Sequence, residues 1–486
     1  MTARDFLTDE HRQRLLSALG CFSSDADAVA DPIRGFLPLR SYGRALQAQT
    51  IVVRGERGAG KTALFRFLRA LTERRVPVRR VFPDLPDTPV LWVEGFSESD
   101  KAQPQPAVLD QAASSLTEDD LRTLWVGHLA ARLGSSLPDA APLPEPFGTA
   151  WRSDPTSPGA WLDSARTSLP ALVRWLDDVD TALASRGESV QVTYDHLDKL
   201  GQTNPALRER YVLSLLALWL SLSNRYTRVR PKVFLREDLF DRARQTPDGS
   251  KLETRSIRLE WNREDLFRVL LRHLGTDDEL KAWTDAWPQP LSWVHDEVLG
   301  WMPPDALPEE GPVSQKGVAE QIVDAVMGAG TKKGYTHRWI PNHLQDARGS
   351  IVPRSIVNLF AFAAEYASEK GPKAIGAHLL RPFELQAGLE KTSLYRVAEL
   401  KEEHRVVGRV EALRGLVVMA ARTEVTTRLA KAPDPGDGFG DDGERAFTEL
   451  ERLGVLRVRP DGRVDVPDLY RYGYEIKRKG GVARPR

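Results

Sequence analysis

The sequence predicts a parallel α/β core, followed by a mostly helical region and a C-terminal domain that ends in a β-hairpin. Three observations support this prediction. Apolar strand-like runs alternate with helical patterns up to Trp261, the strand pattern then stops, and Pro460-Asp461-Gly462 forms a turn signal between two short β-branched runs. We therefore expect four segments: an N-terminal helix and connector (1–45), the α/β core (46–261), a helical region (262–370) and a C-terminal domain (371–486).

Length and composition limit the classes of protein to consider. The 486 residues suffice for two to four domains, and the 68 Lys and Arg balance the 68 Asp and Glu, so overall charge argues neither for nor against a nucleic-acid partner. Cys21 is the only cysteine, which excludes a disulfide framework within the chain. The most apolar run, residues 211–222, is shorter than the roughly 20 residues that span a bilayer. We expect a cytoplasmic protein without a membrane partner.

The elements of the α/β core follow one another in a regular order. Ile51-Val52-Val53 predicts a first strand, and the glycines after it lead into an amphipathic helix. Such alternation is typical of a parallel sheet covered on both faces. The further predicted strands are 89–96, 190–194, 232–235 and 256–259, and the predicted helices between them are 121–133, 160–184 and 207–224.

The turn after the first strand carries the most specific motif of the sequence. Residues 55–62, GERGAGKT, match the pattern G-x-x-x-x-G-K-[ST] in full. In this pattern the glycines allow backbone N–H groups to surround a phosphate, and the positive end of the next helix faces the same anion. The lysine then reaches the β- and γ-phosphates, and the hydroxyl binds Mg²⁺. We predict ATP with Mg²⁺ as cofactors, held by Gly55, Arg57, Gly58, Ala59, Gly60, Lys61, Thr62 and Ala63.

A second acidic site follows the predicted strand 190–194. Asp195 ends this strand, where a carboxylate would hold Mg²⁺ together with Thr62; its alternative role is to cap the next helix. Hydrolysis also needs a group that activates water, and His196 and Asp198 are the candidates. The alternatives are a packing or surface role for His196 and a solvated or capping role for Asp198.

Two arginines are candidate phosphate sensors. Arg236 ends the predicted strand 232–235, where a cation would contact the γ-phosphate; the alternative is an ion pair with Glu237 or Asp238. Arg354 begins a predicted helix in the region 262–370, and its alternative is an ordinary surface position.

These motifs together resemble the P-loop ATPases of the AAA+ and STAND group. Asp195-x-x-Asp198 is similar to the acidic motif of NACHT- and KAP-type NTPases, and the order of segments is similar to bacterial conflict and defence ATPases and to replication-origin ATPases. The resemblance implies a helical lid at 262–370, a winged-helix-like C-terminal domain, sensor roles for Arg236 and Arg354, and a homo-oligomer formed on nucleotide binding. This sequence departs from the family pattern at two positions: His196 replaces the usual acid or small residue, and Lys199 stands where NACHT proteins often carry Glu. Because of these departures we expect slow turnover of ATP.

The C-terminal domain leaves the output open. Its last ten residues carry Lys477, Arg478, Lys479, Arg484 and Arg486 and no acid, which fits DNA phosphates, docking onto a protein or a solvated tail. The leading hypothesis is an ATP-driven switch that signals to an effector or regulatory protein, in bacterial defence or regulation. The alternatives are a DNA-binding ATPase of the origin or transposition-regulator type and, less in keeping with the sequence, a small-molecule kinase.

Overall fold

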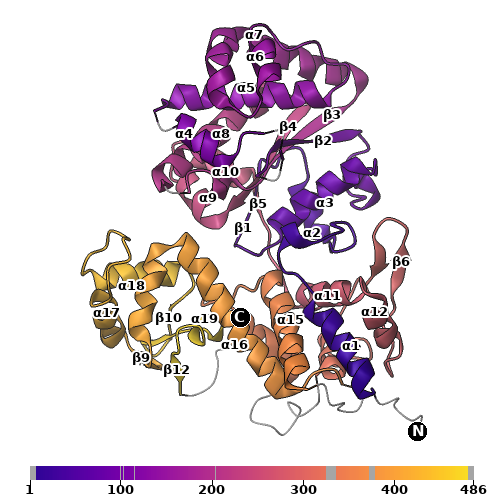
Figure 1. Ribbon diagram of the computed structural model, residues 1–486, viewed down its shortest axis with the longest axis vertical. Coiled ribbons are helices and arrows are strands. Elements are labelled where there is room, and N and C mark those ends of the chain that lie inside the picture. The colour runs from indigo at the N-terminus through magenta and orange to yellow at the C-terminus, as the bar shows by residue number, and fades with distance from the viewer. Residues whose placement is uncertain are drawn as a thin grey trace. The chain divides into compact units, whose positions relative to one another are not determined.

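The computed structural model describes residues 7–98, 100–101, 103–113, 115–202, 204–323, 335–371 and 378–479. The chain divides into two compact units. The core unit is Ala30–Glu260, and the lid unit combines the segment up to Val29 with the segment from Trp261 on. Each unit is described by itself (Figure 1).

A five-stranded parallel sheet forms the centre of the core unit. The strand order is β2-β3-β4-β1-β5, so the strand before the phosphate loop lies between β4 and β5. All five strands were predicted, and the α/β fold class is confirmed. The strands are β1 (Val52–Gly55), β2 (Val90–Phe96), β3 (Ser189–Tyr194), β4 (Val229–Arg236) and β5 (Ser256–Arg258).

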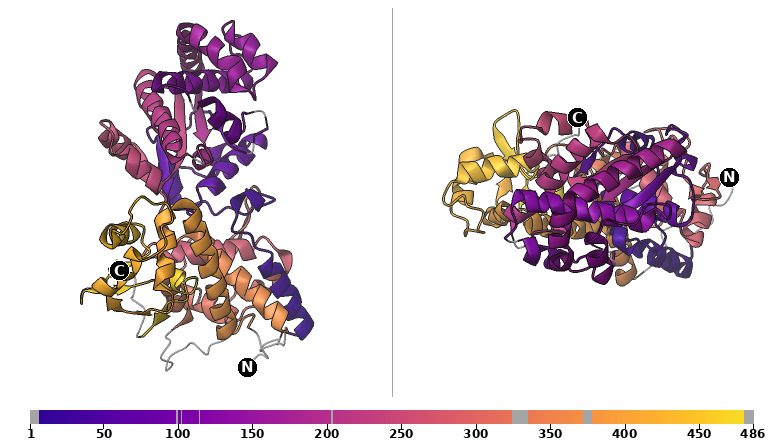
Figure 2. Two further views of the ribbon diagram at one scale, coloured as in Figure 1. Left: turned by 60° about the vertical axis from the view of Figure 1, so that its left-hand side comes forward. Right: turned by 90° about the horizontal axis from the view of Figure 1, so that it is seen from above.

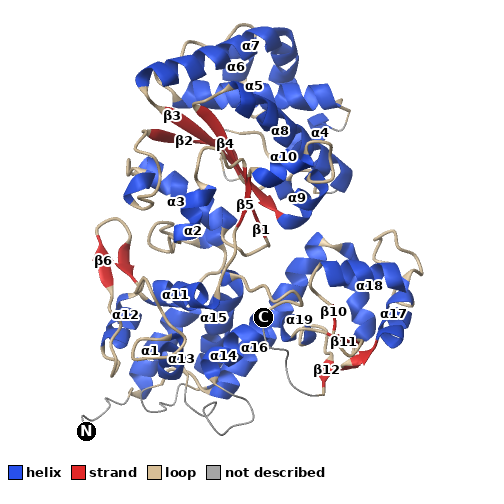
Figure 3. Ribbon diagram, turned by 180° about the vertical axis from the view of Figure 1, so that it is seen from behind, coloured by secondary structure: helices blue, strands red, loops and turns tan. Residues whose placement is uncertain are grey.

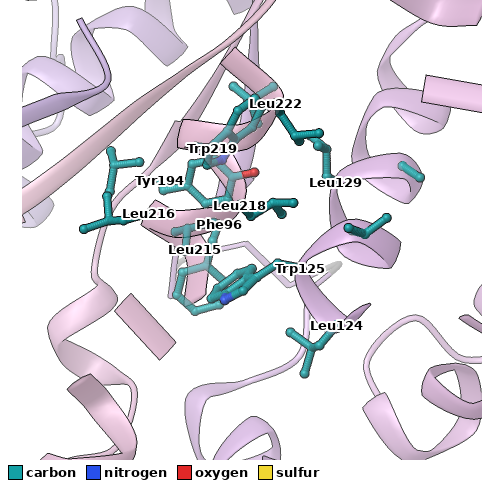
Figure 4. Packing of buried hydrophobic residues seen from close by; sticks show 14 of the residues in the cluster. Phe96, Leu124, Trp125, Leu129, Tyr194, Leu215, Leu216, Leu218, Trp219 and Leu222 are labelled. Atoms are coloured by element: carbon teal, nitrogen blue, oxygen red, sulfur yellow. The ribbon is translucent and has the colours of Figure 1, made fainter. Parts of the chain in front are cut away.

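The two faces of the sheet bury different side chains because successive residues of a strand point to opposite sides. Val192 and Tyr194 of β3 join the large apolar cluster, in which Trp125 of α5 and Trp219 of α8 stand edge-on to Tyr194 (Figure 4). On the other face, Phe234 of β4 packs edge-on against Phe65 of α3. Residues at the strand ends that lie on the same face of the sheet as Phe234 therefore point toward α3.

The helices of the core unit include an insertion between β2 and β3. Prediction placed helices at 121–133 and 160–184, and the structure extends both and adds the shorter α4 and α6. The helices are α2 (Arg40–Ala45), α3 (Lys61–Glu73), α4 (Pro106–Ala113), α5 (Glu118–Ser136), α6 (Phe147–Ser153), α7 (Pro158–Arg186), α8 (Pro205–Arg225), α9 (Glu237–Ala243) and α10 (Gly249–Thr254), with 3₁₀ turns η2 (Val78–Arg80) and η3 (Leu197–Lys199).

The lid unit is mostly helical, and its N-terminal helix α1 (Asp9–Gly20) packs along α15 (Pro353–Lys370). Arg12 of α1 is fully buried and pairs at 2.9 Å with Glu384 of α16 (Pro382–Glu403). α15 and α16 lie side by side (Figures 1 and 2). The other helices before residue 371 are η1 (Ala26–Ala28), α11 (Arg263–Leu274), α12 (Asp278–Asp285), α13 (Gln315–Ile322) and α14 (Thr336–Leu344).

Within the described part of the helical region 262–370, the expectation that strands stop after Trp261 is wrong at one hairpin. β6 (Val294–Asp296) and β7 (Gly300–Met302) form an antiparallel hairpin within the helical region (Figure 3). His295 and Trp301 face each other across it with ring centroids 4.7 Å apart, and Lys281 lies over the Trp301 ring at 3.9 Å. This aromatic pairing stabilises strands that are too short to show a period in the sequence.

The C-terminal part of the lid unit has a winged-helix-like fold. Helices α17 (Arg422–Ala430) and α18 (Gly443–Arg452) precede the antiparallel pair β10 (Arg457–Val458) and β11 (Arg463–Asp465), which β9 (Ala420–Ala421) extends. The turn between β10 and β11 contains Gly462 at φ +79°, as the Pro-Asp-Gly signal predicted. The remaining elements are η5 (Arg405–Leu413), β8 (Val417–Val418), α19 (Asp468–Arg471) and β12 (Lys477–Arg478).

Within the described parts of both units, no helix combines the length and the apolar character needed to cross a membrane.

Candidate nucleotide-binding site

The phosphate loop joins the end of β1 to the start of α3. Gly58 and Gly60 have φ angles of +83° and +93°, a backbone conformation that side chains with a Cβ rarely adopt. The Ala59 side chain is buried, whereas Arg57 and Ala63 are half-buried at the loop and in the first turn of α3. The loop therefore has the glycine-dependent turn and the helix start that a phosphate site requires.

Lys61 places its amino group inside this loop. Its Nζ donates hydrogen bonds to the backbone carbonyl oxygens of Gly55 at 2.8 Å and of Glu56 at 2.9 Å. Glu56 is in turn 3.5 Å from Arg258 at the end of β5, so the loop is tied to the neighbouring strand. Two carbonyl oxygens thus hold the lysine charge at the start of the loop whose N–H groups the motif assigns to phosphate binding.

Asp195 follows β3 and meets Thr62 of α3. The side chain of Asp195 is 6% exposed, and the Thr62 hydroxyl lies near enough to stabilise its charged form. Burial raises the pKa of Asp195, against the opposing effects of His196 and of the hydrogen bond from Thr62. Asp195 is not a helix cap, because His196 occupies the cap position of η3 and Asn204 caps α8.

One oxygen of Asp195 is suited to bind a cation. Its Oδ2 is buried and has no hydrogen-bond partner among the described residues. A buried carboxylate oxygen without a partner is costly, and a cation would remove that cost. Oxygen ligands from a carboxylate and a hydroxyl are those that Mg²⁺ prefers, so Asp195 and Thr62 fit this ion.

His196 is packed into the site and is not a surface residue. It has φ +58°, and its side chain is 11% exposed. Its Nε2 is 3.9 Å from Asp195 Oδ2, and its Nδ1 is 3.5 Å from the hydroxyl of Ser97, the residue after β2. Sequence analysis missed Ser97, although a polar residue directly after a strand beside β3 was a usable signal.

Arg236 lies beside the first glycine of the phosphate loop, because Gly55 of β1 is paired in register with Arg236 of β4. Its Nε and Nη2 each lie 3.0 Å from one oxygen of Asp238, and its Nη1 is 3.6 Å from Asp198. The alternative interpretation, an ion pair with Glu237 or Asp238, is therefore met by Asp238. Glu237 pairs instead with Arg54.

Arg208 of α8 is a further cation near this cluster that sequence analysis missed. Burial and the charge of Arg236 lower its pKa. The Arg208 guanidinium donates to the carbonyl oxygens of Leu200 at 3.2 Å and Gly201 at 3.3 Å, while Asp110 of α4 accepts from the N–H of Gly201 at 2.9 Å. The turn behind Asp195 and Asp198 is thus held from two helices.

Arg354 and the basic C-terminal residues belong to the lid unit. Arg354 lies in the first turn of α15, where its Nη1 is 2.5 Å from Glu399 of α16, and its phosphate-sensing role stays a prediction. Arg478 is nearly buried and pairs with Asp465 at 2.9 Å, so it has a structural role. Lys477 and Lys479 are exposed, and Arg484 and Arg486 lie outside the described residues.

Comparisons with known proteins give distant structural similarity only. No protein-family model matches the chain, and no curated protein is significantly similar to it. Among solved structures, the chain is similar to the ORC2 protein of Aeropyrum pernix in ADPNP–ADP complexes, with 11% identity, 89% of this chain and 86% of that chain covered, and a TM-score of 0.41. The A. pernix ORC1 protein in complex with DNA is 14% identical, with 92% of this chain and 94% of that chain covered and a TM-score of 0.38. A Walker-type ATPase of Pyrococcus abyssi is 13% identical, with 90% of this chain and 93% of that chain covered and a TM-score of 0.38.

Similarity at this level assigns no residue a role, so the roles rest on the geometry of this chain. The phosphate loop follows a strand with neighbours on both sides, and Asp195, His196, Arg236 and Ser97 all follow strands at the same edge of the sheet. The core unit therefore has a parallel α/β fold of the P-loop NTPase type, which a helical lid and a winged-helix-like domain follow in the chain.

Proposed function

We propose that this chain binds ATP with Mg²⁺ at the loop from Gly55 to Thr62 and hydrolyses ATP slowly. The observation that carries the proposal is the meeting of Thr62 with the buried carboxylate of Asp195, next to a loop that already holds the amino group of Lys61. Thr62 and Asp195 would hold Mg²⁺, and Mg²⁺ when bound neutralises charge on the phosphates. Lys61 adds a positive charge on the loop side.

Slow turnover follows from the residue beside Asp195. An imidazole occupies the position of His196, and Ser97 and Asp195 both lie within 4 Å of its ring nitrogens. A neutral histidine held between two polar groups can orient or deprotonate water, but unlike a carboxylate it places no negative charge beside the attacking water. Asp198 is the second candidate for this role, and its carboxylate lies 3.6 Å from Arg236.

The biological role that we propose is a molecular switch of the AAA+ and STAND type. Nucleotide would change the lid, which carries Arg354, and the output would pass to an effector or regulatory protein in bacterial defence or regulation. A nucleotide-dependent homo-oligomer would be the active form. The support for this role is the Asp195-x-x-Asp198 pattern together with a lid that forms a compact unit of its own.

Substitution of Lys61 tests the proposal. Lys61→Ala should lower the affinity for ATP at least tenfold, since it removes the phosphate-binding charge of the loop. Isothermal titration with ATP and Mg²⁺ measures the affinity, and light scattering shows whether ATP changes the assembly state. Lys251→Ala, which removes a largely exposed lysine of α10 in the same unit, is the matched control. Unchanged affinity and assembly in Lys61→Ala would exclude the switch.

A DNA-binding ATPase is the second candidate, and the wing supports it. Arg457, Arg459 and Arg463 lie on β10, β11 and the turn between them, and Lys477 and Lys479 are exposed nearby in the sequence. Helix α18 carries Glu444, Glu449 and Glu451, so this candidate function assigns DNA-backbone contacts to the wing and no base reading to α18. DNA-stimulated turnover that falls steeply with salt would favour this candidate. Arg463→Ala together with Lys477→Ala should then weaken DNA binding and leave ATP affinity unchanged.

A further inference from the structure

The guanidinium of Arg236 presents two different edges to its neighbours. Asp238, in the first turn of α9, takes the edge formed by Nε and Nη2 in a bidentate pair with both distances at 3.0 Å. The outer edge, formed by Nη1 and Nη2, is the second place at which a planar guanidinium can bind an anion through two parallel hydrogen bonds. Asp238 thus holds one edge of Arg236, and Asp198 lies toward the other.

Asp198 lies on the side of the outer edge but at a longer distance. Its Oδ2 is 3.6 Å from Nη1, beyond the range of a good hydrogen bond, so the attraction is that of an ion pair. The Asp198 side chain is also the more exposed of the two acids, at 32% against 21% for Asp238. A weak, partly solvated ion pair is readily displaced by a better ligand.

A terminal phosphate is such a ligand. Arg236 is paired in register with Gly55, so its side chain follows β4 directly beside the start of the phosphate loop. Phosphate oxygens bind a guanidinium edge in the same bidentate manner as a carboxylate and carry more charge. The nearby Arg208 adds a second positive charge, which increases the attraction for an incoming anion.

We propose that the two carboxylates act on Arg236 in opposite directions, and this inference rests on the proposed ATP site. Asp238 is a positioning residue that fixes the guanidinium so that its outer edge meets the terminal phosphate. Asp198 competes with that phosphate for the same edge. Together they set the preference of the site for a nucleoside triphosphate over a diphosphate, because only the triphosphate reaches Arg236.

The test measures this preference in two single variants. ADP and a non-hydrolysable ATP analogue, each with Mg²⁺, are titrated into the full-length protein and its variants by calorimetry. Asp198→Asn should raise the preference for the ATP analogue over ADP by about fivefold to tenfold, and Asp238→Asn should lower it by a similar factor, the scale of one ordinary hydrogen bond. The affinity for ADP should stay the same in both variants, which also shows that the site remains folded.

Three further variants make the outcome decisive. Asp241→Asn, which changes another acid of α9 that pairs with Arg244 at 3.4 Å, should leave the preference unchanged. Asp238→Glu should recover part of the preference, because it restores the charge. With Arg236→Lys as the background, neither Asp198→Asn nor Asp238→Asn should change the preference, since an ammonium has no edges to divide.

Some results would contradict the inference. Shifts of the same sign in Asp198→Asn and Asp238→Asn, or no shift in either, would overturn it while the wild-type protein still binds both nucleotides. If the wild-type protein binds neither nucleotide, the proposed function fails and this inference fails with it.

Discussion

Two arginine–aspartate pairs, one at the phosphate edge of the core unit and one in the winged-helix-like domain, have similar local geometry and different surroundings. Arg409 is fully buried; Asp437 takes its Nε and Nη2 at 2.6 and 2.8 Å, and the carbonyl of Leu429 takes its Nη1 at 3.2 Å. Arg236 has the same bidentate pair, but its Nη1 faces Asp198 at 3.6 Å.

The two pairs differ in role, because Arg409 stabilises the fold whereas Arg236 is suited to bind a ligand. A buried charge whose hydrogen bonds are all made within the protein holds segments together, as Arg409 holds the loop that follows α17. A charge with a weak ion-pair partner, or a carboxylate such as Asp195 with an unpartnered oxygen, lowers the stability of the fold. Binding of a ligand to such a group restores that stability. Groups of this second kind lie together at the phosphate edge, which is the sheet edge where Gly55, Asp195 and Arg236 end or follow their strands.

The largest effect should come from breaking the complete pair. Arg409→Ala leaves Asp437 buried without its partner, and we expect the free energy of unfolding of the lid unit to fall by about 3–5 kcal/mol. Urea unfolding followed by circular dichroism measures the loss. Arg422→Ala, which removes an exposed pair with Glu444, is the control and should cost less than about 1 kcal/mol. Equal losses in the two variants would remove the distinction drawn for Arg409.

A smaller effect should come from the turn behind Asp198. Gly201 has φ +60°, and a Cβ there would lie 2.5 Å from the backbone nitrogen of Arg208. Gly201→Ala should therefore cost about 2–3 kcal/mol and weaken ATP binding, since both the φ angle and the contact are strained. Gly415→Ala meets no atom within 4 Å at φ +74°, so it should show the backbone cost alone, about 1 kcal/mol. Thermal unfolding compares the two, and a smaller loss for Gly201→Ala would contradict the tight packing.

Asp195→Asn should stabilise the nucleotide-free protein while it removes Mg²⁺-dependent turnover. Burial raises the pKa of Asp195, so the folded protein binds a proton more tightly there than the unfolded chain, and stability is lost as the pH rises through this range. The uncharged amide avoids that cost, and we expect a gain of roughly 1 kcal/mol at neutral pH.

Melting temperatures across a pH series check this prediction. The gain should disappear below about pH 4, the ordinary pKa of an aspartate in an unfolded chain, because Asp195 is then protonated in both states. A variant that is less stable than the wild type at pH 7 would show that Asp195 is well satisfied without a cation.

The smallest effect should come from Ser97. Ser97→Ala removes the hydroxyl 3.5 Å from His196 Nδ1, and we expect kcat to fall about threefold with ATP affinity unchanged. His196→Ala should lower kcat further, and the double variant should be no slower than His196→Ala alone, because Ser97 acts through His196. Additive losses would show that Ser97 has a separate role.

Much of the core could be predicted because its signals are local. The loop from Gly55 to Thr62 needs residues at fixed spacing, and each strand of a buried parallel sheet is a short apolar run between turn residues. Asp195 and Arg236 were selected as candidates because each stands at the end of such a run, and parallel strands end at the same edge of a sheet. The hairpin of β6 and β7 was missed because its strands have three residues each, too few to show a period.

By itself, the sequence determined the phosphate loop, the five strands and the acids and arginine that follow them, because these depend on residue type and spacing along one segment. Only the tertiary structure decided which partners those groups have: Thr62 for Asp195, Ser97 for His196, and Asp238 in place of Glu237 for Arg236. It also decided that α1 packs with the lid unit, through Arg12 and Glu384, which are 372 residues apart. Such contacts join segments that are distant in the chain, and their energies depend on burial and distance, which no local pattern encodes.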